Sequence, residues 1–245
     1  MVIQKRCLAW DWTNTKDCPQ MMDQVKFDGP ISAVSNWNTW YPTELRDRAP
    51  FRPMVRLQAQ LSGDDWNNIW NSDQPIIHYF NEPERASITP QQACDWWYEK
   101  MVPLRNEKGK KLVSPSCASD PAGQAWIADF LQRVSGAPPD FLGLHYYGTD
   151  GNAAIAFIED MHHRHPNMPI IVSEIASTHR NYADVLGFTC QLCNWMDEKD
   201  WVFEYAFFGC MRAPADDFVS PAAQLMNPDG SFKDLMWKHY AVEKG

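Results

Sequence analysis

The stretch PIIHYFNEPE, residues 75–84, begins as a buried strand and ends in polar and charged side chains. Residues 75–80 form a mostly apolar run without in-out alternation, the pattern of a strand that is buried on both faces. The run ends in Asn81, Glu82 and Glu84, with a proline between the two glutamates. Carboxylates are costly to place at the tip of a strand built for a dry interior. This tip is therefore expected to have a chemical role.

Seven further segments share this apolar pattern along the whole chain. Together the eight candidate strands are residues 7–12, 31–37, 52–57, 76–81, 111–116, 141–147, 169–175 and 202–209. Between them lie helix-like segments with recognisable starts, such as Thr89-Pro90, an N-cap followed by proline at the first helical position. Strands that alternate with helices in 245 residues predict an α/β fold, a single (β/α)8 TIM barrel. The alternative is a doubly wound open sheet, which normally carries a glycine-rich first turn that this sequence lacks.

One domain is expected, because no linker, charge block or low-complexity stretch divides the sequence. This single catalytic barrel domain is predicted to span residues 1–245. The first ten residues do not have the pattern of a signal peptide, and no apolar run approaches the length of a membrane span. A cytosolic protein and a protein whose leader was removed ahead of Met1 both remain open. The seven cysteines are too dispersed for a zinc or iron–sulfur site, and buried free thiols are the expected state.

Composition limits the classes of ligand. A formal net charge of −9 argues against a nucleic-acid partner, because nothing here could neutralise a row of phosphates, and it disfavours an anionic membrane surface. A neutral ligand meets no such repulsion. The chain also contains 12 Trp, 12 Phe and 8 Tyr, and the N–H of a buried Trp needs a hydrogen-bond partner. A surplus of Trp therefore indicates an aromatic-lined groove as well as an aromatic core.

The candidate site residues lie where the predicted strands end. In a parallel barrel the chemistry takes place at the C-terminal ends of the strands, where the connecting loops converge. The polar and aromatic residues at these ends are Trp10, Asn36, Trp37, Trp40, Asn81, Glu82, His145, Tyr146, Tyr147, Glu174 and Phe208. Their side chains are predicted to crowd one rim of the barrel.

Glu82 and Glu174 are the most informative pair, because each ends a rising apolar run, IIHYFNE and IIVSE respectively. Strands four and seven are three places apart in a ring of eight, so their tips would face each other across the mouth. Carboxyl groups about 5–5.5 Å apart suit double displacement at a sugar carbon, whereas a gap of about 6.5–9.5 Å would admit a water and invert that carbon. One such glutamate alone could equally cap a helix or form a salt bridge. Two at opposed tips favour a catalytic pair.

The histidines have competing interpretations. His145 and Tyr147 lie two residues apart on one strand and therefore share a face. Their neighbours favour exposure to the pocket, although a lone histidine is more often structural. His162, His163 and His165 cluster where a helix ends, and they are expected to form a solvated cationic patch rather than a metal site. No metal ligands are predicted in this chain.

Five motifs, taken in order, resemble glycoside hydrolase family 128, a clan A family of β-1,3-glucanases. They are CLAWDW near the start, FNEPE at the fourth strand, LHYYG at the sixth, VSEIA at the seventh and FFG at the eighth. The resemblance covers nearly the whole chain. It implies a retaining mechanism with Glu82 as acid/base and Glu174 as nucleophile, without a metal or an organic cofactor. It also implies that Asn81 hydrogen-bonds the sugar 2-hydroxyl and that Tyr147 orients the nucleophile.

The expected function is therefore retaining, endo-acting hydrolysis of β-1,3-glucan. The aromatic rim suits this partner, since sugar C–H faces pack on rings while amides orient hydroxyls, and Trp37 and Tyr146 are the strongest candidates. One departure is that Phe207 and Phe208 stand where many clan A relatives carry Trp. A monomer that binds β-1,3-glucan oligosaccharide or polysaccharide, without nucleic-acid or membrane partners, is expected. The resemblance suggests a secreted or extracellular enzyme, although no leader or N-glycosylation sequon supports this.

Two alternatives remain open. The first keeps the retaining mechanism and replaces the polymer with another β-linked polysaccharide, a mannan or a xylan. The second is a non-catalytic barrel that binds β-glucan without cleaving it, although the presence of both glutamates disfavours this interpretation.

Overall fold

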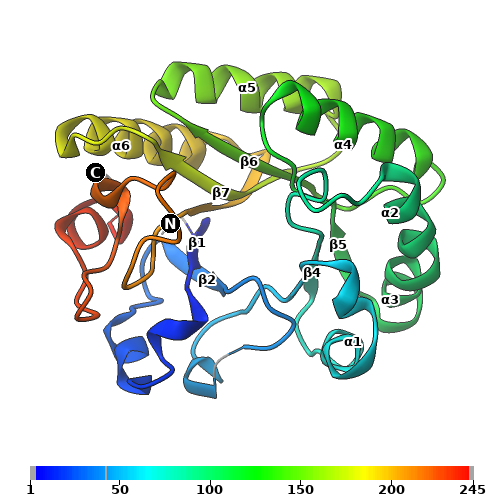
Figure 1. Ribbon diagram of the computed structural model, residues 1–245, viewed down its shortest axis with the longest axis horizontal. Coiled ribbons are helices and arrows are strands. Elements are labelled where there is room, and N and C mark those ends of the chain that lie inside the picture. Colours follow the sequence, from blue (N-terminus) through cyan, green and yellow to red (C-terminus); the bar gives the residue numbers. More distant parts are fainter. Residues whose placement is uncertain (1–3, 42, 243–245) are drawn as a thin grey trace.

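The computed structural model describes residues 4–41 and 43–242 of the chain. In these ranges the strands are β1 (Arg6–Ala9), β2 (Ile31–Ser35), β3 (Met54–Val55), β4 (Ile76–Tyr79), β5 (Lys111–Val113), β6 (Leu142–Gly148), β7 (Ile170–Ser177) and β8 (Val202–Phe207). Each strand lies within or overlaps one of the eight segments predicted from the apolar pattern. The strands lie around the middle of the molecule, and helices cover much of their outer side (Figure 1).

The strands form two parallel sheets in the described part of the chain. One sheet has the order β2-β1-β8-β7-β6, and the other has the order β3-β4-β5. Every ladder within them is parallel, which requires a crossover connection between successive strands. The prediction of an α/β fold with parallel sheets is therefore confirmed.

The closed ring of the predicted TIM barrel is not shown. Where β2 approaches β3 and where β5 approaches β6, only isolated bridges join the chain segments. These bridges are Val34–Phe51, Val113–Phe141 and Cys117–Leu144. Proline limits β3 on its N-terminal side, because Pro53 directly precedes the strand and a proline has no N–H to donate to a ladder. The order of neighbouring strands is nevertheless that of a ring.

Six α-helices connect or follow the strands in the described ranges. They are α1 (Gly63–Trp70), α2 (Pro90–Trp96), α3 (Val102–Lys108), α4 (Pro121–Arg133), α5 (Gly151–Arg164) and α6 (Tyr182–Glu198). Their starts follow the sequence signals: the Thr89 side chain accepts a hydrogen bond from Gln92 N, and that of Asp120 accepts one from Gly123 N. No helix within these ranges has both the length and the apolar character needed to cross a membrane.

Several connections contain no α-helix, unlike those of the predicted barrel. β1 is followed by 3-10 helices at Trp12–Asn14 and Pro19–Gln24, and β2 is followed by a 3-10 helix at Thr43–Leu45. After β8 the chain forms a long connection, with a 3-10 helix at Pro221–Ala223, before a π-helix at Leu235–Tyr240. In the described residues, the β2–β3 connection therefore provides no α-helix to pack against α1.

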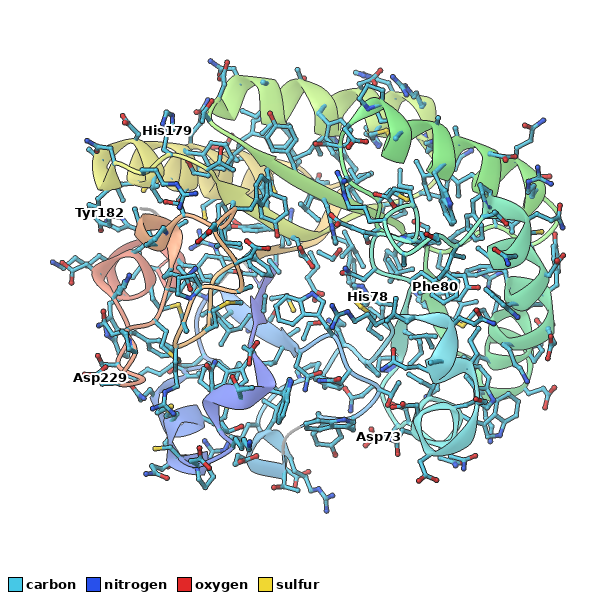
Figure 2. The ribbon with its side chains drawn as sticks, viewed as in Figure 1. Asp73, His78, Phe80, His179, Tyr182 and Asp229 are labelled. Atoms are coloured by element: carbon cyan, nitrogen blue, oxygen red, sulfur yellow. The ribbon has the colours of Figure 1, made fainter. Side chains whose placement is uncertain are left out.

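The interior contains charged as well as apolar side chains. The main apolar cluster draws on residues from Leu8 to Tyr240. Among the strands, Arg52 Nη2 donates to Glu204 Oε2 at 2.6 Å, and both side chains are buried. His78 lies near the middle of the view in Figure 2, and burial, with the charge of Arg52, lowers its pKa to about 3. Its imidazole is therefore neutral at ordinary pH, so it adds no charge beside the ion pair.

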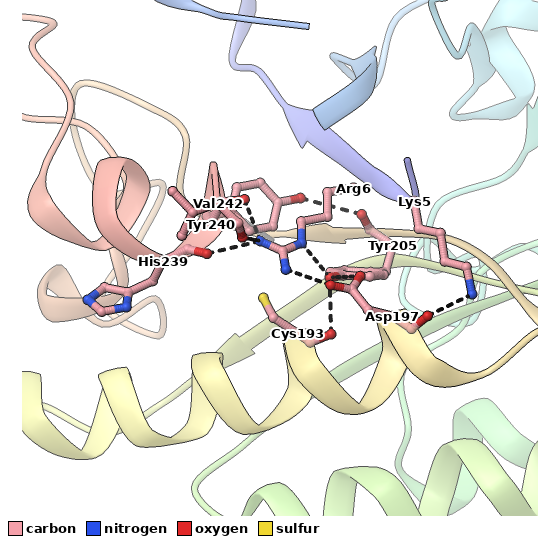
Figure 3. Close-up of polar contacts among 8 residues, drawn as sticks. All are labelled: Lys5, Arg6, Cys193, Asp197, Tyr205, His239, Tyr240 and Val242. Carbon is pink, nitrogen blue, oxygen red and sulfur yellow. Dashed lines mark hydrogen bonds and ion pairs between the residues drawn. The ribbon is translucent and has the colours of Figure 1, made fainter. Parts of the chain in front are cut away.

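The first and last strands meet at a buried guanidinium. β1 and β8 pair at Arg6 and Tyr205. Arg6 donates to Asp197 Oδ2 on α6 at 2.6 Å and to the Tyr205 hydroxyl at 2.7 Å (Figure 3). It also donates to the main-chain carbonyls of His239, Tyr240 and Val242 at 2.9, 2.7 and 2.6 Å. One side chain thus joins β1, β8, α6 and the C-terminal segment.

Replacement of Arg6 with methionine is predicted to destabilise the protein strongly. The variant leaves the buried Asp197 carboxylate without its charged partner, so we expect the free energy of unfolding to fall by about 3–5 kcal/mol. Urea denaturation measures this change. The matched control is Arg48→Met, whose partner Asp23 lies at the surface and whose loss is expected to cost less than about 1 kcal/mol. Equal, small losses in the two variants would contradict a stabilising role for the Arg6 cluster.

Candidate active site

A cavity of about 660 Å³ lies at the C-terminal ends of the strands. The predicted site residues that line it are Trp37, Asn81, Glu82, Tyr147, Glu174 and Phe208. The remaining lining residues are Asp11, Arg56, Arg85, Ala118, Ser119, Asp120, Met211, Ala215, Asp216, Phe218 and Val219. Each of the eight strands, or the segment that directly follows it, contributes residues to this lining. The parallel arrangement thus brings the polar strand ends together in one place.

Glu174 is held by two donors, one on the neighbouring strand β6 and one just after β2. Its side chain is nearly buried on β7. The Trp37 indole N–H donates to Oε1 at 2.7 Å, and the Tyr147 hydroxyl donates to Oε2 at 2.6 Å. Because each oxygen accepts a separate hydrogen bond, the plane of the carboxylate is fixed within the cavity. Burial, followed by the charge of Glu174, raises the pKa of Tyr147, so this phenol remains a donor.

Glu82 stands on the other side of the cavity floor and is more accessible, with its side chain 24% exposed. His145 Nδ1 lies 3.1 Å from its Oε1, and Arg85 Nε lies 3.6 Å from its Oε2. Burial acts to raise the pKa of Glu82, but the hydrogen bond from His145 and the charges of His145 and Arg85 outweigh burial and lower it. In this environment Glu82 holds its proton less tightly than an ordinary glutamate.

His145 is a fully buried imidazole between the two carboxylates. Its Nδ1 faces Glu82, and its Nε2 lies 3.7 Å from Glu174 Oε1. Burial acts to lower the pKa of His145, but the charge of Glu174 and the hydrogen bond to Glu82 outweigh it and raise the pKa. The two glutamates are therefore coupled through one ring, and a proton on that ring is shared with Glu82 along a single hydrogen bond.

Two residues of the site have a left-handed backbone conformation that non-glycine residues rarely adopt. The φ angle is 58° at Trp37 and 42° at Glu82, and Phe80 beside them has 35°. Hydrogen bonds hold the strained segment, since Glu82 N donates to Ser116 O at 2.8 Å and Ser116 N donates to Phe80 O at 3.1 Å. Such strain persists only where the surroundings enforce it, and it concentrates at functional sites.

The remaining predicted residues of the cavity contribute an amide and an aromatic wall. Asn81 Oδ1 is buried and, among the described residues, has no hydrogen-bond partner, so it is available to a ligand hydroxyl. The Phe208 ring packs edge-on against Trp37 and Tyr147, with centroid distances of 5.5 and 5.9 Å. Asn36 is buried behind the cavity, where its side chain bonds to the main chain of Trp40 at 3.2 Å and thereby shapes the turn that carries Trp37.

Five of the predicted ligand contacts do not line this cavity. Asn36 and His145 are two of them: both are buried behind the lining, so the predicted exposure of His145 to the pocket is wrong. Trp10 is fully buried and packs against Phe232, so it belongs to the core and the prediction that it binds a ligand is wrong. Tyr146 packs against Phe157 of α5 and does not line the cavity, because alternate residues of a strand point to opposite faces. Trp40 is exposed, but it lines a different hollow.

The loop after β8 supplies a wall of the cavity that sequence reasoning did not identify. The Phe218 ring packs against Tyr147 with a centroid distance of 5.2 Å. Asp216 Oδ1 accepts from Phe218 N and Val219 N at 2.9 and 3.1 Å, and Arg180 donates to the carbonyls of Asp217 and Val219. The one available signal was the length of the segment after strand eight, since an irregular loop has no periodicity.

Nothing in the described ranges groups three or more His, Cys, Asp or Glu side chains in a way that could hold a metal ion. The centre of the site instead provides the carboxylates of Glu82 and Glu174, the buried His145 imidazole that contacts both, and the Trp37 and Tyr147 donors. This set can transfer protons and can form a covalent bond through a carboxylate oxygen.

Comparison with known proteins gives consistent findings. The profile of a family described as "Glycosyl hydrolase catalytic core" matches residues 7–239. A family 128 subgroup VI exo-β-1,3-glucanase from Aureobasidium namibiae is 57% identical, with 99% of this chain and 97% of that chain covered and a TM-score of 0.97. A subgroup IV endo-β-1,3-glucanase from Lentinula edodes shares the fold at 24% identity, with 95% and 97% covered and a TM-score of 0.80. Alkali-sensitive linkage protein 1 of Schizosaccharomyces pombe is 28% identical over 103 residues, which are 40% of this chain and 19% of that protein.

Replacement of His145 with glutamine is predicted to change how stability depends on pH. A histidine whose pKa is raised on folding contributes stability that is complete below its unfolded pKa of about 6.5 and is lost as the pH rises through the folded value. The stability advantage of the wild-type protein over His145→Gln should therefore shrink as the pH rises above that unfolded value. Denaturant unfolding of both proteins from about pH 5 to about pH 9 measures the difference in their free energies of unfolding. This pH range lies above that in which Glu82 titrates.

The control for loss of an imidazole is His163→Gln, because His163 is exposed on α5. An unfolding free-energy difference between wild type and His145→Gln that stays constant across the whole pH series would contradict the raised pKa of His145.

Proposed function

The chain belongs to glycoside hydrolase family 128, a family of β-1,3-glucanases, and we propose that it cleaves β-1,3-glucan by double displacement. Glu174 is the nucleophile and Glu82 is the acid/base. The observation that carries this proposal is the placement of the two carboxylates on the two nitrogens of one buried imidazole, at a single cavity.

The first chemical step forms a covalent intermediate. A Glu174 oxygen attacks the anomeric carbon while Glu82 donates its proton to the glycosidic oxygen, and the rest of the glucan leaves with a new hydroxyl. In the second step Glu82 accepts a proton from water, which attacks the same carbon and releases Glu174 as a carboxylate. Two inversions give net retention at that carbon. Trp37 and Tyr147 fix the Glu174 carboxylate for the attack.

His145 supplies the proton that Glu82 needs. In the free protein the pKa of Glu82 is lowered and that of His145 is raised, so the proton of this pair resides on the imidazole. Transfer along the Nδ1–Oε1 hydrogen bond gives neutral His145 and protonated Glu82 without a change in net charge. A sugar that displaces water from the cavity favours this neutral pair, because separated charges are costly at low dielectric. Binding thus prepares the acid.

The lining of the cavity suits a neutral, hydroxyl-rich substrate. Phe208 and Trp37 present aromatic surface for sugar C–H faces, and Asn81 Oδ1 is free of partners in the described structure. The amide lies beside Glu82, where it can accept a hydrogen bond from the hydroxyl next to the bond that is cleaved. The β-1,3 linkage rests on family membership. Mannan and xylan are the alternative substrates of the same mechanism.

We propose exo action, in which product is released from the ends of the glucan chain, in place of the expected endo action. The relative that is 57% identical is an exo enzyme. In this chain the β8 loop forms one wall of the cavity, and Arg180 ties that loop to the segment after β7. A wall at this position limits how far a glucan chain extends past Phe218. We further propose one barrel domain that acts as a monomer, and secretion stays a prediction.

Glu174→Gln and Glu82→Gln are each predicted to abolish hydrolysis almost completely. The first variant lacks the nucleophile and the second lacks the proton donor, so we expect the release of reducing ends from a laminarin-type glucan to fall at least about 100-fold. The control is Glu198→Gln, at an exposed position on α6. More than about a tenth of wild-type activity in either cavity variant would contradict the assigned roles.

The wild-type protein provides the second half of this test. Proton NMR of the first product from a β-1,3-gluco-oligosaccharide should show the β anomer before mutarotation. Early α anomer would rule out double displacement. Parallel assays on mannan and xylan distinguish the substrate alternatives, and glucan binding without any product would favour the non-catalytic barrel.

Phe218→Ala is predicted to weaken the preference of the enzyme for the ends of glucan chains. Loss of the ring opens the cavity wall beside Tyr147, so the product profile should change from one short product to a mixture, and KM should rise about three- to tenfold. Chromatography of products from a reduced oligosaccharide series measures both effects. The control is Phe203→Ala, which removes the same kind of ring from another exposed position, near the N-terminal end of β8 and away from the cavity. An unchanged product profile would remove Phe218 from substrate selection.

A further inference from the structure

Arg85 and Asp120 lie beside Glu82 on the wall of the catalytic cavity. Arg85 belongs to the turn that follows β4, and Asp120 is the N-cap residue of α4, so the two side chains come from separate segments. Arg85 Nη2 donates to Asp120 Oδ2 at 2.8 Å, and Arg85 Nε lies 3.6 Å from Glu82 Oε2. One guanidinium is thus shared between Glu82 and a second carboxylate that takes no part in the proposed bond cleavage.

Asp120 is fixed in place by the start of α4. Its Oδ1 accepts a hydrogen bond from Gly123 N at 2.9 Å, and its Oδ2 accepts one from Arg85. The hydrogen bond from Gly123 N and the charge of Arg85 outweigh the effect of burial and lower the pKa of Asp120. Asp120 therefore remains an anion through the pH range in which Glu82 exchanges its proton.

The charges of Arg85 and Asp120 act on Glu82 in opposite directions. The positive charge of Arg85 favours the Glu82 carboxylate, whereas the negative charge of Asp120 disfavours it. The Arg85 side chain is 57% exposed and that of Asp120 is 43% exposed, so water weakens both effects. Each charge is therefore suited to a modest adjustment of Glu82.

The other titratable groups around Glu82 belong to the core of the site. His145 of β6 bonds to Glu82 directly, and Glu174 of β7 lies on the far side of that imidazole. The remaining groups are Tyr147 of β6, the buried Cys117 thiol after β5, and Glu84 of the turn after β4. Arg85 and Asp120 add one positive and one negative charge to this set, so the pair leaves the net charge of the site unchanged.

The two steps of double displacement place opposite demands on Glu82. It must hold a proton when the glycosidic bond breaks, and it must be a carboxylate when water attacks the intermediate. Arg85 without Asp120 would favour the second state at the expense of the first, and Asp120 without Arg85 would do the reverse. The bonded pair leaves both states accessible.

We propose that Arg85 and Asp120 act through Glu82 as an opposed charge pair, which sets the highest pH at which Glu82 still donates a proton. They are positioning residues, because the reacting atoms belong to Glu82, Glu174 and the sugar. The role rests on the proposed function, since it requires Glu82 as the acid/base. It does not depend on which β-linked glycan occupies the cavity.

Arg85→Gln and Asp120→Asn are predicted to move the basic limb of the pH–rate profile in opposite directions. Loss of the positive charge should raise the pH at which kcat/KM falls by about 0.3–0.8, and loss of the negative charge should lower it by about 0.2–0.5. Asparagine caps a helix as well as aspartate does, so α4 keeps its start. Initial rates on a soluble β-1,3-gluco-oligosaccharide from about pH 4 to about pH 9 measure both limits.

Three controls separate an effect of charge from an effect on structure. Arg85→Lys keeps the positive charge and should leave the limit within about 0.2 of the wild-type pH. Arg133→Gln and Asp129→Asn break an exposed ion pair of 2.8 Å near the other end of α4, and they should leave the profile unchanged. The shifts should also shrink when NaCl rises from about 0.02 M to about 0.5 M, because salt screens exposed charges.

Carbon-13 NMR of the Glu82 carboxyl group provides the same test without hydrolysis. Its titration midpoint in the free protein should rise in Arg85→Gln, which lacks the nearby cation, and fall in Asp120→Asn, which lacks the nearby anion. The signal that disappears in Glu82→Gln identifies this carboxyl group.

The rates and the NMR titrations together distinguish failure of the charge pair from failure of the proposed function. Hydrolysis by the wild-type protein, combined with shifts that are absent or that have the same sign in Arg85→Gln and Asp120→Asn, would overturn the charge pair alone. Opposed NMR shifts in a protein that does not hydrolyse β-linked glycans would support the effect of the pair on Glu82 and overturn the catalytic proposal.

Discussion

The positions of the loops at the catalytic cavity depend on how β1 and β8 are joined. Their ladder contains one register pair, Arg6 with Tyr205, and an isolated bridge follows between Trp10 and Cys210. So few main-chain bonds leave the seam dependent on the buried Arg6 guanidinium, which reaches α6 and the C-terminal segment as well. Just beyond this seam, β1 and β8 run into Asp11 and Phe208, which line the cavity. A charge buried at one end of the strands therefore sets the geometry at the other end.

The site itself combines strain with charge coupling. Glu82 has an unfavourable φ, and its backbone stays there because Ser116, which follows β5, accepts from Glu82 N and donates to Phe80 O. The imidazole of His145 then places one positive charge between two negative ones, which makes two close carboxylates tolerable in a partly buried cavity. The same arrangement gives the two glutamates different partners. Tyr147 and Trp37 donate to Glu174, whereas Glu82 pairs with the His145 imidazole, and this difference is the basis for the separate roles that we propose for them.

Sequence reasoning found the features that depend on burial and missed those that depend on irregular backbone. Strands buried on both faces leave long apolar runs, so all eight were located, and the polar ends of β4 and β7 identified Glu82 and Glu174. Residue type alone did not reveal which way a ring points, so Trp10 and Tyr146 were assigned to the rim although they pack elsewhere. Phe218 lies in a loop whose shape depends on Arg180, a residue distant in sequence. No local pattern encodes that contact.

The irregular connections account for what is particular to this chain. Parallel strands fix the two glutamates, and any family member with the same strand ends can present the same pair. The segments after β1, β2 and β8 lack α-helices at their starts, so they are free to form walls and hollows of their own. One of them brings Phe218 against Tyr147, and another leaves α1 open beside Trp40. The proposed chemistry thus depends on the regular part of the fold, whereas the proposed selection of chain ends depends on a loop that departs from it.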